Sequence, residues 1–405
     1  MIYEEIIKDH ILTNNSKIVL IIMDGLGDIP HPDFENKTPL EYAATPNLDD
    51  LTKSSMLGRI SPILPGITPG SGPAHLAIFG YDPLQQQIGR GVLEALGLDM
   101  KLKSNDIAAR SNFATIDSKG IIKDRRAGRI SDDKGDALCE LISSINEING
   151  IKIKIKPGKE HRFVTVFSSE ANELGSLVSD TDPLHDDLPI QKAVGNNKNS
   201  QYLADAINTF TEKSLELLKN EHPANAVLMR GLSSRPRILS MRDKYKLEAA
   251  AIAAYPMYRG IASLLGFSIL PSAESIEELF EIYHKHSNKY DYFYIHIKGT
   301  DKTGEDGDFL GKAKCIEKVD KALPILLKNR PDVLCITGDH SSPALMHSHS
   351  WHPVPVLIHS KFCGSDASKR FTEIESTIGG LGDFESKYLM GLLLANAGRL
   401  QKFGA

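Results

Sequence analysis

The sequence predicts an α/β protein built on a doubly wound, mostly parallel sheet, with a smaller α+β domain inserted into it. Apolar runs cover residues 17–23, 292–297 and 333–337, and each ends on or just before a carboxylate. Short apolar runs bounded by glycine are typical of strands buried on both faces of a parallel sheet. The chain has 405 residues, which is long for one hydrophobic core and favours two domains.

The composition is that of an ordinary globular enzyme, with 41% hydrophobic and 24% charged residues. A formal net charge of -5 gives no reason to expect nucleic-acid or membrane binding. The apolar runs are far shorter than the ~20 residues of a membrane span, and residues 1–10 predict an acidic amphipathic helix rather than a signal peptide. The cysteines show no CxxC spacing, and Cys315 and Cys335 lie in apolar patterns typical of buried thiols. We therefore expect a cytoplasmic enzyme.

The first hundred residues alternate strand and helix patterns. Thr45 and Pro46 predict the start of a helix after the first strand. Residues 60–73 are rich in proline and glycine, which predicts a loop leading into an apolar helix over 74–80. Ser71 lies in this loop just ahead of the helix, where backbone N–H groups and the helix dipole favour a phosphate.

The pattern changes between residues 106 and 238. Residues 108–115 and 161–167 predict short strands separated by polar turns. Residues 151–156 alternate strictly between isoleucine and lysine, as expected for a strand with one face in water. This region is interpreted as an α+β domain.

A helical pattern returns over residues 246–255, and the second and third apolar runs follow it. If all three runs share one sheet, the middle of the chain must leave the first domain and return to it. We therefore expect residues 1–105 and 239–405 to form a discontinuous core domain, and residues 106–238 to form an insertion suited to act as a hinged lid.

Acids and a histidine stand at the ends of the three apolar runs, namely Asp24, Asp301, Asp339 and His340. In an open parallel sheet, ligands bind beyond the carboxyl ends of the strands. Clustered carboxylates repel one another unless a cation lies between them. The pattern predicts a metal site assembled from both ends of the chain. The alternatives are a turn residue for Asp24 and a solvated acidic loop for Asp301.

Further candidate ligands follow these acids. Glu305 stands four residues after Asp301, so both carboxylates could lie on one face of a turn. His347, His349 and His352 precede a Pro-x-Pro segment, and such a cluster is more typical of metal ligands than of a core.

Ser71 is the candidate nucleophile. A serine hydroxyl is a poor nucleophile at neutral pH unless a base or a metal lowers its pKa. A metal held by Asp24, Asp339 and His340 would do that. Taken alone, Ser71 is interpreted as a loop serine.

Basic residues gather in the predicted insertion. Arginine side chains match phosphate and carboxylate oxygens in pairs, so these residues predict an anionic substrate. For any single arginine, solvated surface charge is the alternative. Asp124 and His161 are candidates for proton transfer and positioning. The basic residues considered are Lys123, Arg125, Arg126, Arg129, Arg162, Arg230, Arg235 and Arg237.

Taken together, several motifs resemble a known family along nearly the whole chain. They are Asp24-Gly, the Pro69–His75 loop, Lys298-Gly-Thr-Asp301, Thr337-Gly-Asp-His340, His349-Ser-x-x-Pro-Val-Pro355, Ile88–Gly97, Asp124–Arg129, Glu160-His-Arg162 and Ser179–Pro183. The set resembles the alkaline phosphatase superfamily, and specifically its archaeal-type, 2,3-bisphosphoglycerate-independent phosphoglycerate mutases. This resemblance implies an alkaline-phosphatase-like core with an inserted lid.

The resemblance also implies two divalent metal ions, Mn²⁺ or Mg²⁺ with Co²⁺ or Zn²⁺ as alternatives, and no 2,3-bisphosphoglycerate. The family usually has histidine where this chain has Glu305, and tends to have aspartate where it has His352. A glutamate oxygen is a harder donor, which favours Mg²⁺ or Mn²⁺ or leaves that ion weakly held. The implied ligands are Asp24, Ser71, Asp339 and His340 for one ion, and Asp301, Glu305 and His349 for the other.

The implied reaction is the interconversion of 3-phosphoglycerate and 2-phosphoglycerate in glycolysis and gluconeogenesis, through a metal-activated phosphoserine. The lid must exclude water, which would otherwise turn the mutase into a phosphatase. His161 is the expected proton shuttle and Asp124 a second catalytic candidate. The expected substrate contacts are Arg125, Arg126, Arg129, Arg162 and Arg230 of the insertion and Arg259 of the core.

Alternative functions remain open from the sequence. One is a metal-dependent phosphomonoesterase or another phosphosugar mutase of the same superfamily. Another is phosphonopyruvate decarboxylation, an activity also given to members of this family, which would leave Ser71 without a role. A third is a metal-binding protein without catalysis, which only the change to Glu305 favours. The sequence does not predict the oligomeric state.

Overall fold

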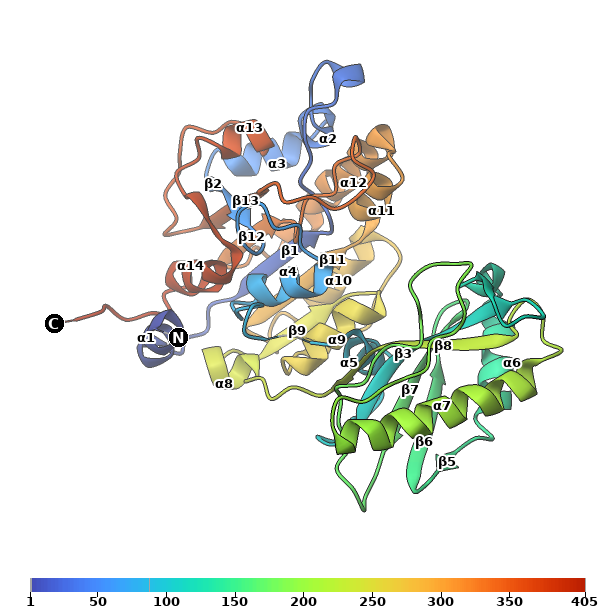
Figure 1. Cartoon of the computed structure of the whole chain (residues 1–405). Coiled ribbons are helices and arrows are strands. Elements are labelled where there is room, and N and C mark those ends of the chain that lie inside the picture. The colour runs from blue at the N-terminus through green and yellow to red at the C-terminus, as the bar shows by residue number, and fades with distance from the viewer. Residues whose placement is uncertain (1, 87, 405) are drawn as a thin grey trace. The chain divides into compact units, whose positions relative to one another are not determined.

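The structure is a computed structural model that describes residues 2–86 and 88–404 (Figure 1). The chain forms two compact units. Residues 1–87 and 238–405 make up the first, here called the core unit, and residues 88–237 make up the second, here called the insertion. Residues 88–105, which we expected in the core, group with the insertion because α5 (Arg90–Gly97) packs against strands of that unit.

The core unit is built on an eight-stranded sheet with the strand order β10-β9-β11-β1-β12-β13-β2-β14. Neighbouring strands are parallel except where β13 pairs with β12 and β2. The mostly parallel sheet is therefore confirmed. The strands are β1 (Ile18–Met23), β2 (Met56–Ser61), β9 (Ala249–Ile252), β10 (Ser268–Ile269), β11 (Tyr292–Ile297), β12 (Val333–Thr337), β13 (Val354–Ser360) and β14 (Gly382–Glu385).

The three apolar runs are the adjacent strands β11, β1 and β12. In the register of this sheet, Met23 lies opposite Ile297 and Ile22 lies opposite Thr337. Every residue of these strands is buried. Because the three strands are parallel and end level with one another, the residues that follow them meet at one edge of the sheet.

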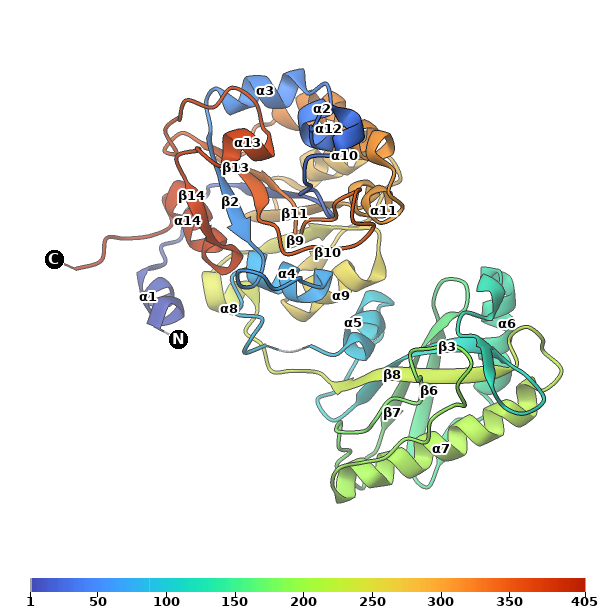
Figure 2. The same ribbon diagram turned by 45° about the horizontal axis from the view of Figure 1, so that its top comes forward.

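Helices cover both faces of the core sheet, which explains why its central strands are mostly apolar (Figure 2). One face carries α2 (Pro39–Tyr42), α3 (Pro46–Thr52), α10 (Ile276–His286) and α12 (Phe309–Leu327), and the other carries α4 (Ser71–Ile78), α9 (Pro256–Leu264) and α14 (Leu389–Asn396). The remaining core helices are α1 (Ile2–His10), α8 (Met241–Tyr245), α11 (Gly299–Glu305) and α13 (Glu373–Ser376).

The helix predicted over residues 246–255 is wrong. Strand β9 occupies Ala249–Ile252 and lies between β10 and β11, with all four residues buried. Alanine favours helices in isolated peptides, but packing between neighbouring strands overrides such a weak preference.

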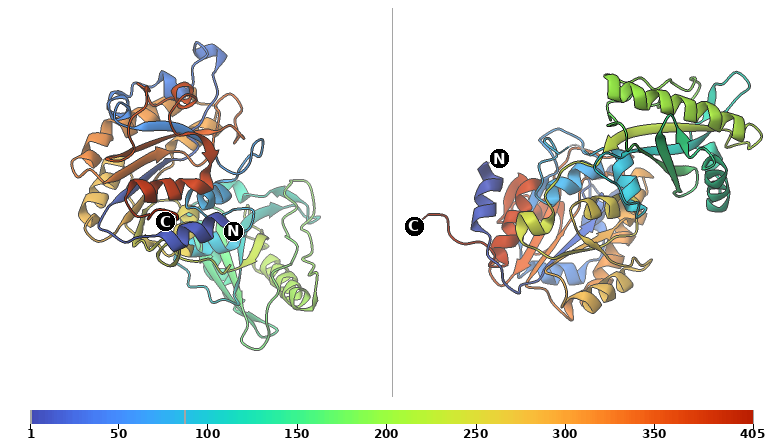
Figure 3. Two further views of the ribbon diagram at one scale, coloured as in Figure 1. Left: turned by 90° about the vertical axis from the view of Figure 1, so that its left-hand side faces the viewer. Right: turned by 90° about the horizontal axis from the view of Figure 1, so that it is seen from below.

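The insertion is an antiparallel α+β unit, as predicted. Its sheet has the order β4-β3-β7-β6-β5, and β8 also pairs with β3. Helices α6 (Asp132–Ile142) and α7 (Lys198–Leu218) pack on one face of this sheet around an isoleucine-rich core, and α5 packs against β3, β7 and β8 (Figure 3). The strands are β3 (Ile107–Ile116), β4 (Ile122–Asp124), β5 (Glu147–Ile148), β6 (Ile151–Pro157), β7 (Arg162–Ser168) and β8 (Ala226–Ser234).

Among the described residues, no helix is long and apolar enough to cross a membrane. All four cysteines are free thiols. Cys139 and Cys335 are buried, whereas Cys315, which we expected to be buried, is only partly covered.

Candidate active site

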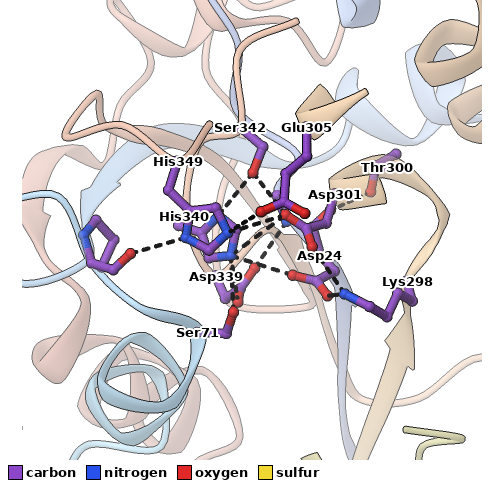
Figure 4. A network of polar contacts seen from close by, with 12 residues as sticks. Asp24, Ser71, Lys298, Thr300, Asp301, Glu305, Asp339, His340, Ser342 and His349 are labelled. Carbon is purple, nitrogen blue, oxygen red and sulfur yellow. Dashed lines mark hydrogen bonds and ion pairs between the residues drawn. The ribbon is translucent and has the colours of Figure 1, made fainter. Parts of the chain in front are cut away.

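Strand ends bring the predicted acids and histidine together at the carboxyl edge of the core sheet (Figure 4). Asp24 follows β1, Asp339 and His340 follow β12, and Asp301 lies in the first turn of α11. Asp24, Asp339 and His340 have no exposed surface, and Asp301 is only 4% exposed.

The ligand atoms form two overlapping sets, each with its atoms within 4.8 Å of one another. The first donor group consists of Asp24, Asp339 and His340, and the second of Asp301, His340 and His349. Nε2 of His340 lies 3.4 Å from Asp24 Oδ1 and 3.3 Å from Asp339 Oδ2. His340 therefore belongs to both groups.

His349 completes the second donor group. Its Nδ1 donates to the carbonyl oxygen of Pro69 at 3.0 Å, which turns Nε2 toward the acids. Nε2 lies 3.4 Å from Asp301 Oδ1 and 3.5 Å from Glu305 Oε1. The ring stacks on that of His340, with centroids 3.7 Å apart. Glu305 thus lies beside the second donor group, although its side chain is 52% exposed.

The donor groups fit divalent cations. Asp24 Oδ1 and Asp339 Oδ2 are buried, and neither has a hydrogen-bond partner among the described residues. A buried carboxylate oxygen without a partner is costly unless a cation or a donor satisfies it. Carboxylate oxygen and imidazole nitrogen together suit Mn²⁺, Mg²⁺, Co²⁺ and Zn²⁺.

Ionisation also favours cation binding. Burial alone would raise the pKa of Asp24, but the neighbouring His296, His340 and Lys298 hold the pKa of its carboxyl well below the ordinary value. The pKa of Asp301 is lowered in the same way, because contacts with His349 and Lys298 outweigh burial. Both carboxylates are therefore charged at neutral pH, as metal ligands must be.

Ser71 is the first residue of α4, after Gly70 at the N-cap. Its Oγ lies 3.3 Å from His340 Nε2, which places the hydroxyl at the rim of the first donor group. His75, one turn later, donates from Nδ1 to the Ser71 carbonyl at 2.8 Å and lies 3.3 Å from Asp339 Oδ2. The helix start thus holds Ser71 beside the candidate ligands.

Lys298 and Tyr258 contact the site but were not among the predicted site residues. Nζ of Lys298 donates to Asp24 Oδ2 and Asp301 Oδ2, at 2.9 Å each. The Tyr258 hydroxyl donates to Asp24 Oδ2 at 2.5 Å, and its ring stacks on His296. Lys298 stood in one of the motifs and could have been found from its place at a strand end. Tyr258 carried no signal beyond that of a helix residue.

Other predicted residues of the core do not join the donor groups. His347 is exposed, and His352 approaches Ser350 Oγ through Nδ1 at 3.0 Å and stacks on Trp351. Arg259 lies in α9 next to Tyr258. Its predicted contact with phosphate stays a prediction.

The insertion brings its own charged residues together on one sheet surface. Arg110 of β3 lies opposite Arg230 of β8, and Asn112 lies opposite Arg162 of β7. Arg110 is 9% exposed and Asn112 is 5% exposed. Arg110 Nε, Arg230 Nε and Asn112 Oδ1 are buried without a hydrogen-bond partner among the described residues. We call Arg110, Asn112, Arg162 and Arg230 the arginine face.

The positive charges at this surface lie close to one another and affect the pKa of Arg110. Burial lowers the pKa of Arg110 to about 10, and Arg230 and Arg162 add to that effect while Glu94 opposes it. The nearest carboxylate oxygen, of Glu94, is 3.7 Å away. The arginine face is therefore suited to bind an anion. Arg110 and Asn112 were missed because a lone polar residue in a strand pattern resembles any solvent-facing position.

His161 stands directly before β7 and is 2% exposed. Its Nδ1 is buried without a hydrogen-bond partner in the described part of the chain. Burial and the neighbouring Arg162 and Arg110 lower the pKa of His161 to about 4. The imidazole is therefore neutral at pH 7 and able to accept a proton.

The predicted Asp124–Arg129 run forms a tight turn. The Asp124 carboxylate accepts hydrogen bonds from the backbone N–H groups of Arg126 and Gly128, at 2.7 and 2.6 Å. Arg125 binds both oxygens of Asp182 at 2.7 Å. These contacts explain the shape of the turn, and the proton-transfer role of Asp124 stays a prediction. Arg126 and Arg129 are exposed.

Comparison with known proteins agrees with the resemblance drawn from the motifs. A family profile described as 2,3-bisphosphoglycerate-independent phosphoglycerate mutase matches residues 52–225. The probable 2,3-bisphosphoglycerate-independent phosphoglycerate mutase of Thermosipho africanus is 48% identical over 403 residues, covering 99% of each chain. The protein of the same description from Aquifex aeolicus is 46% identical over 408 residues, covering 99% of this chain and 100% of the relative.

Solved structures give the same result. The cofactor-independent phosphoglycerate mutase of Thermoplasma acidophilum has a TM-score of 0.73 at 30% identity, with 95% of this chain and 100% of that chain covered. A Pyrococcus horikoshii protein has a TM-score of 0.83 at 32% identity, with 96% and 99% covered. The chain therefore belongs to the family of 2,3-bisphosphoglycerate-independent phosphoglycerate mutases.

Proposed function

We propose that the chain is an isomerase that interconverts 3-phosphoglycerate and 2-phosphoglycerate through a phosphoserine formed on Ser71. The observation that carries this proposal is the position of the Ser71 hydroxyl, 3.3 Å from His340 Nε2 at the edge of a buried acidic cluster. Relatives that match 99% of the chain are named for this activity, which supports the choice of substrate.

Two divalent ions would complete the site, one held by the first donor group with Ser71 and the other by Asp301, Glu305 and His349. Such ions, when bound, would neutralise phosphate oxygens and lower the pKa of a serine hydroxyl. The unpartnered oxygens of Asp24 and Asp339 support this assignment. The reaction would need no 2,3-bisphosphoglycerate, because Ser71 itself carries the phosphoryl group between the two half-reactions.

In the first half-reaction, Ser71 Oγ forms a bond to phosphorus, and the bond from phosphorus to the glycerate oxygen breaks. The departing oxygen takes up the proton that the Ser71 hydroxyl gives up. In the second half-reaction, the other glycerate hydroxyl loses a proton and its oxygen bonds to phosphorus, the bond from phosphorus to Ser71 Oγ breaks, and the proton returns to Ser71 Oγ. Neutral His161 can accept that proton at its unpartnered Nδ1. An anion bound beside the arginines would raise the pKa of His161 and so allow it to hold the proton.

The arginine face is the proposed receptor for the glycerate carboxylate. Arg110 and Arg230 each have an Nε–H donor without a hydrogen-bond partner among the described residues. Holding the glycerate between the two half-reactions distinguishes a mutase from a phosphatase, because free glycerate would be replaced by water. We propose that the insertion is a lid that performs this function.

An assay that couples 3-phosphoglycerate to enolase tests the proposal, with Mn²⁺, Mg²⁺, Co²⁺ or Zn²⁺ and without 2,3-bisphosphoglycerate. We expect 2-phosphoglycerate to form with at least one metal, and little inorganic phosphate. No product with any of the four metals would overturn the proposal. Release of phosphate in place of 2-phosphoglycerate, or faster turnover of another sugar phosphate, would favour the alternative of a phosphomonoesterase or another phosphosugar mutase. The cytoplasmic location stays a prediction.

A further inference from the structure

Lys312 of α12 is a fully buried lysine that lies outside both donor groups. Its Nζ donates to Asp28 Oδ2 at 2.7 Å, to the Ser342 carbonyl at 2.8 Å and to the Gly27 carbonyl at 3.1 Å. Asp28 Oδ2 also accepts from the Ala344 N–H at 3.1 Å. Lysine is almost never fully buried unless it is paired, since burying its charge is costly. Its position therefore needs an explanation.

The segments that Lys312 joins are those that carry the candidate ligands. Gly27 lies in the loop that begins with Asp24 at the end of β1. Ser342 lies two residues after His340, and its N–H donates to the Gly27 carbonyl at 3.0 Å. Helix α12 itself follows α11, which carries Asp301. One ammonium group on α12 thus connects the loops that follow β1 and β12.

Ser342 extends this connection to the ligands themselves (Figure 4). Its hydroxyl donates to Asp301 Oδ1 at 2.9 Å and lies 3.2 Å from His340 Nδ1. His340 is shared by the two donor groups, and Asp301 belongs to the second. The carbonyl of Ser342 is therefore held by Lys312 while its hydroxyl contacts two ligands.

Two glycines allow α11 and the loop after β1 to pack closely against Ser342. A Cβ atom added at Gly304 would lie 2.1 Å from the Ser342 carbonyl oxygen, and one added at Gly25 would lie 2.6 Å from Ser342 Oγ. A shift of Ser342 would thus require α11 or the loop after β1 to shift with it.

We propose that Lys312, acting through Ser342 and with Asp28 as its counter-ion, is a positioning residue that fixes Asp301 relative to His340. It thereby sets the affinity of the second donor group for a divalent cation. The inference rests on the proposed metal dependence of the function, and it concerns cation binding rather than the phosphoryl transfer itself.

The test replaces Lys312 and Asp28 together, as Lys312→Met with Asp28→Asn, so that no unpaired charge is left buried. Mn²⁺ is titrated into the metal-free protein by calorimetry, and the bound ions are counted. We expect the second ion to bind about 10- to 100-fold more weakly, as when other supporting partners of metal ligands are removed. The first ion should keep its affinity.

The chain offers a matched control. Lys244 is also a buried core lysine, and it donates to Glu4 Oε1 at 2.6 Å and to the Gly80 carbonyl at 2.7 Å. Lys244→Met with Glu4→Gln makes the same change of charge at another place. It should lower the thermal midpoint but leave both Mn²⁺ affinities unchanged. Equal losses of Mn²⁺ affinity in both double variants would overturn the inference.

Ser342→Ala tests the route by which Lys312 acts. It should weaken binding of the second ion to a similar degree. Adding it to the Lys312 and Asp28 changes should cause little further loss of Mn²⁺ affinity. Fully additive losses would show that Lys312 does not act through Ser342. If the double variant does not fold, the Mn²⁺ affinity of Ser342→Ala alone tests the inference. A wild-type Mn²⁺ affinity in that variant would overturn it. Because no substrate is present, a failed mutase assay would not affect these results.

Discussion

The core unit buries a cluster of negatively charged side chains, and the insertion buries a cluster of positively charged ones. In the core unit, carboxylates converge at the ends of three strands, and Asp24 Oδ1 and Asp339 Oδ2 have no hydrogen-bond partner among the described residues. In the insertion, Arg110 and Arg230 lie opposite each other on neighbouring strands, and their Nε atoms also lack hydrogen-bond partners among the described residues, although Arg230 Nε lies 3.8 Å from Asp182 Oδ2. In each cluster, a buried polar atom without a partner is costly until a ligand of opposite charge binds.

The two clusters differ in how closely neighbouring side chains pair with their charges. Asp24 is already bound by Lys298 and Tyr258, at 2.9 and 2.5 Å. Among the described residues, the carboxylate that pairs with Arg110 is that of Glu94, at 3.7 Å. The core cluster is therefore held rigidly in its geometry, as bond breaking requires, whereas the arginine face depends on its ligand. This difference supports the proposal that catalysis takes place in the core and that the insertion retains the substrate.

Ser71→Ala should have the largest effect. It removes the proposed nucleophile of the core and leaves the arginine face intact, so we expect kcat to fall by about 10⁴-fold or more. Phosphoglycerate binding, measured by calorimetry, should change little, and Mn²⁺ should still bind. Substantial residual mutase activity in this variant would contradict the phosphoserine route.

Arg110→Met should weaken substrate binding, whereas Ser71→Ala should lower kcat. It removes a charge that would pair with the substrate, so we expect about 2 kcal/mol weaker binding of phosphoglycerate, or roughly 30-fold in Kd. Without substrate, the same variant should be more stable than the wild type, because a buried charge among like charges is lost. Calorimetry and thermal melts of the metal-loaded protein measure both effects.

Lys152→Met is the control for this experiment. Lys152 belongs to β6 of the insertion, and its side chain is 56% exposed in an ion pair with Glu170. Exposed pairs of this kind contribute about 0–1 kcal/mol, so both Kd and the thermal midpoint should stay near the wild-type values. An unchanged Kd in Arg110→Met would separate the arginine face from substrate binding.

The two units should also respond to pH in opposite directions. Burial alone would lower the pKa of His340, but Asp339 and Asp24 raise it to about 9, whereas burial and Arg162 lower the pKa of His161 to about 4. In the unfolded chain both have a pKa of about 6.5. His340 thus stabilises the metal-free protein below pH 6.5, and this contribution is lost as the pH rises to about 9. His161 destabilises it progressively as the pH falls from 6.5 to about 4.

Urea unfolding of the metal-free wild type and of His340→Gln and His161→Gln would measure these contributions. On the alkaline side, the stability of His340→Gln should fall less than that of the wild type. On the acidic side, the stability of His161→Gln should fall less than that of the wild type. Parallel pH profiles for all three proteins would contradict the assigned pKa values.

The site residues that could be predicted from the sequence are those placed by their position at the end of a strand. Asp24, Asp339 and His340 could be placed together because apolar runs mark parallel strands, and such strands end at a common edge. Ser342 and Lys312 could not, because their contacts depend on loops that meet only in the folded chain. Arg110 was missed for a similar reason, since its neighbour Arg230 is joined to it only by strand pairing.

Glu305 should have the smallest effect, because it lies where the core cluster is least enclosed. Its carboxylate is 3.5 Å from His349 Nε2, and the side chain is 52% exposed, so water can replace it as a ligand. We expect Glu305→Ala to weaken the second Mn²⁺ by about 10-fold and leave the first unchanged. Glu305→His should shift the preference of the second ion from Mg²⁺ toward Co²⁺ or Zn²⁺, because a nitrogen donor replaces a hard oxygen. If Glu305→Ala binds both ions as tightly as the wild type, Glu305 is no ligand, and the second ion is then held by the buried residues that Ser342 positions.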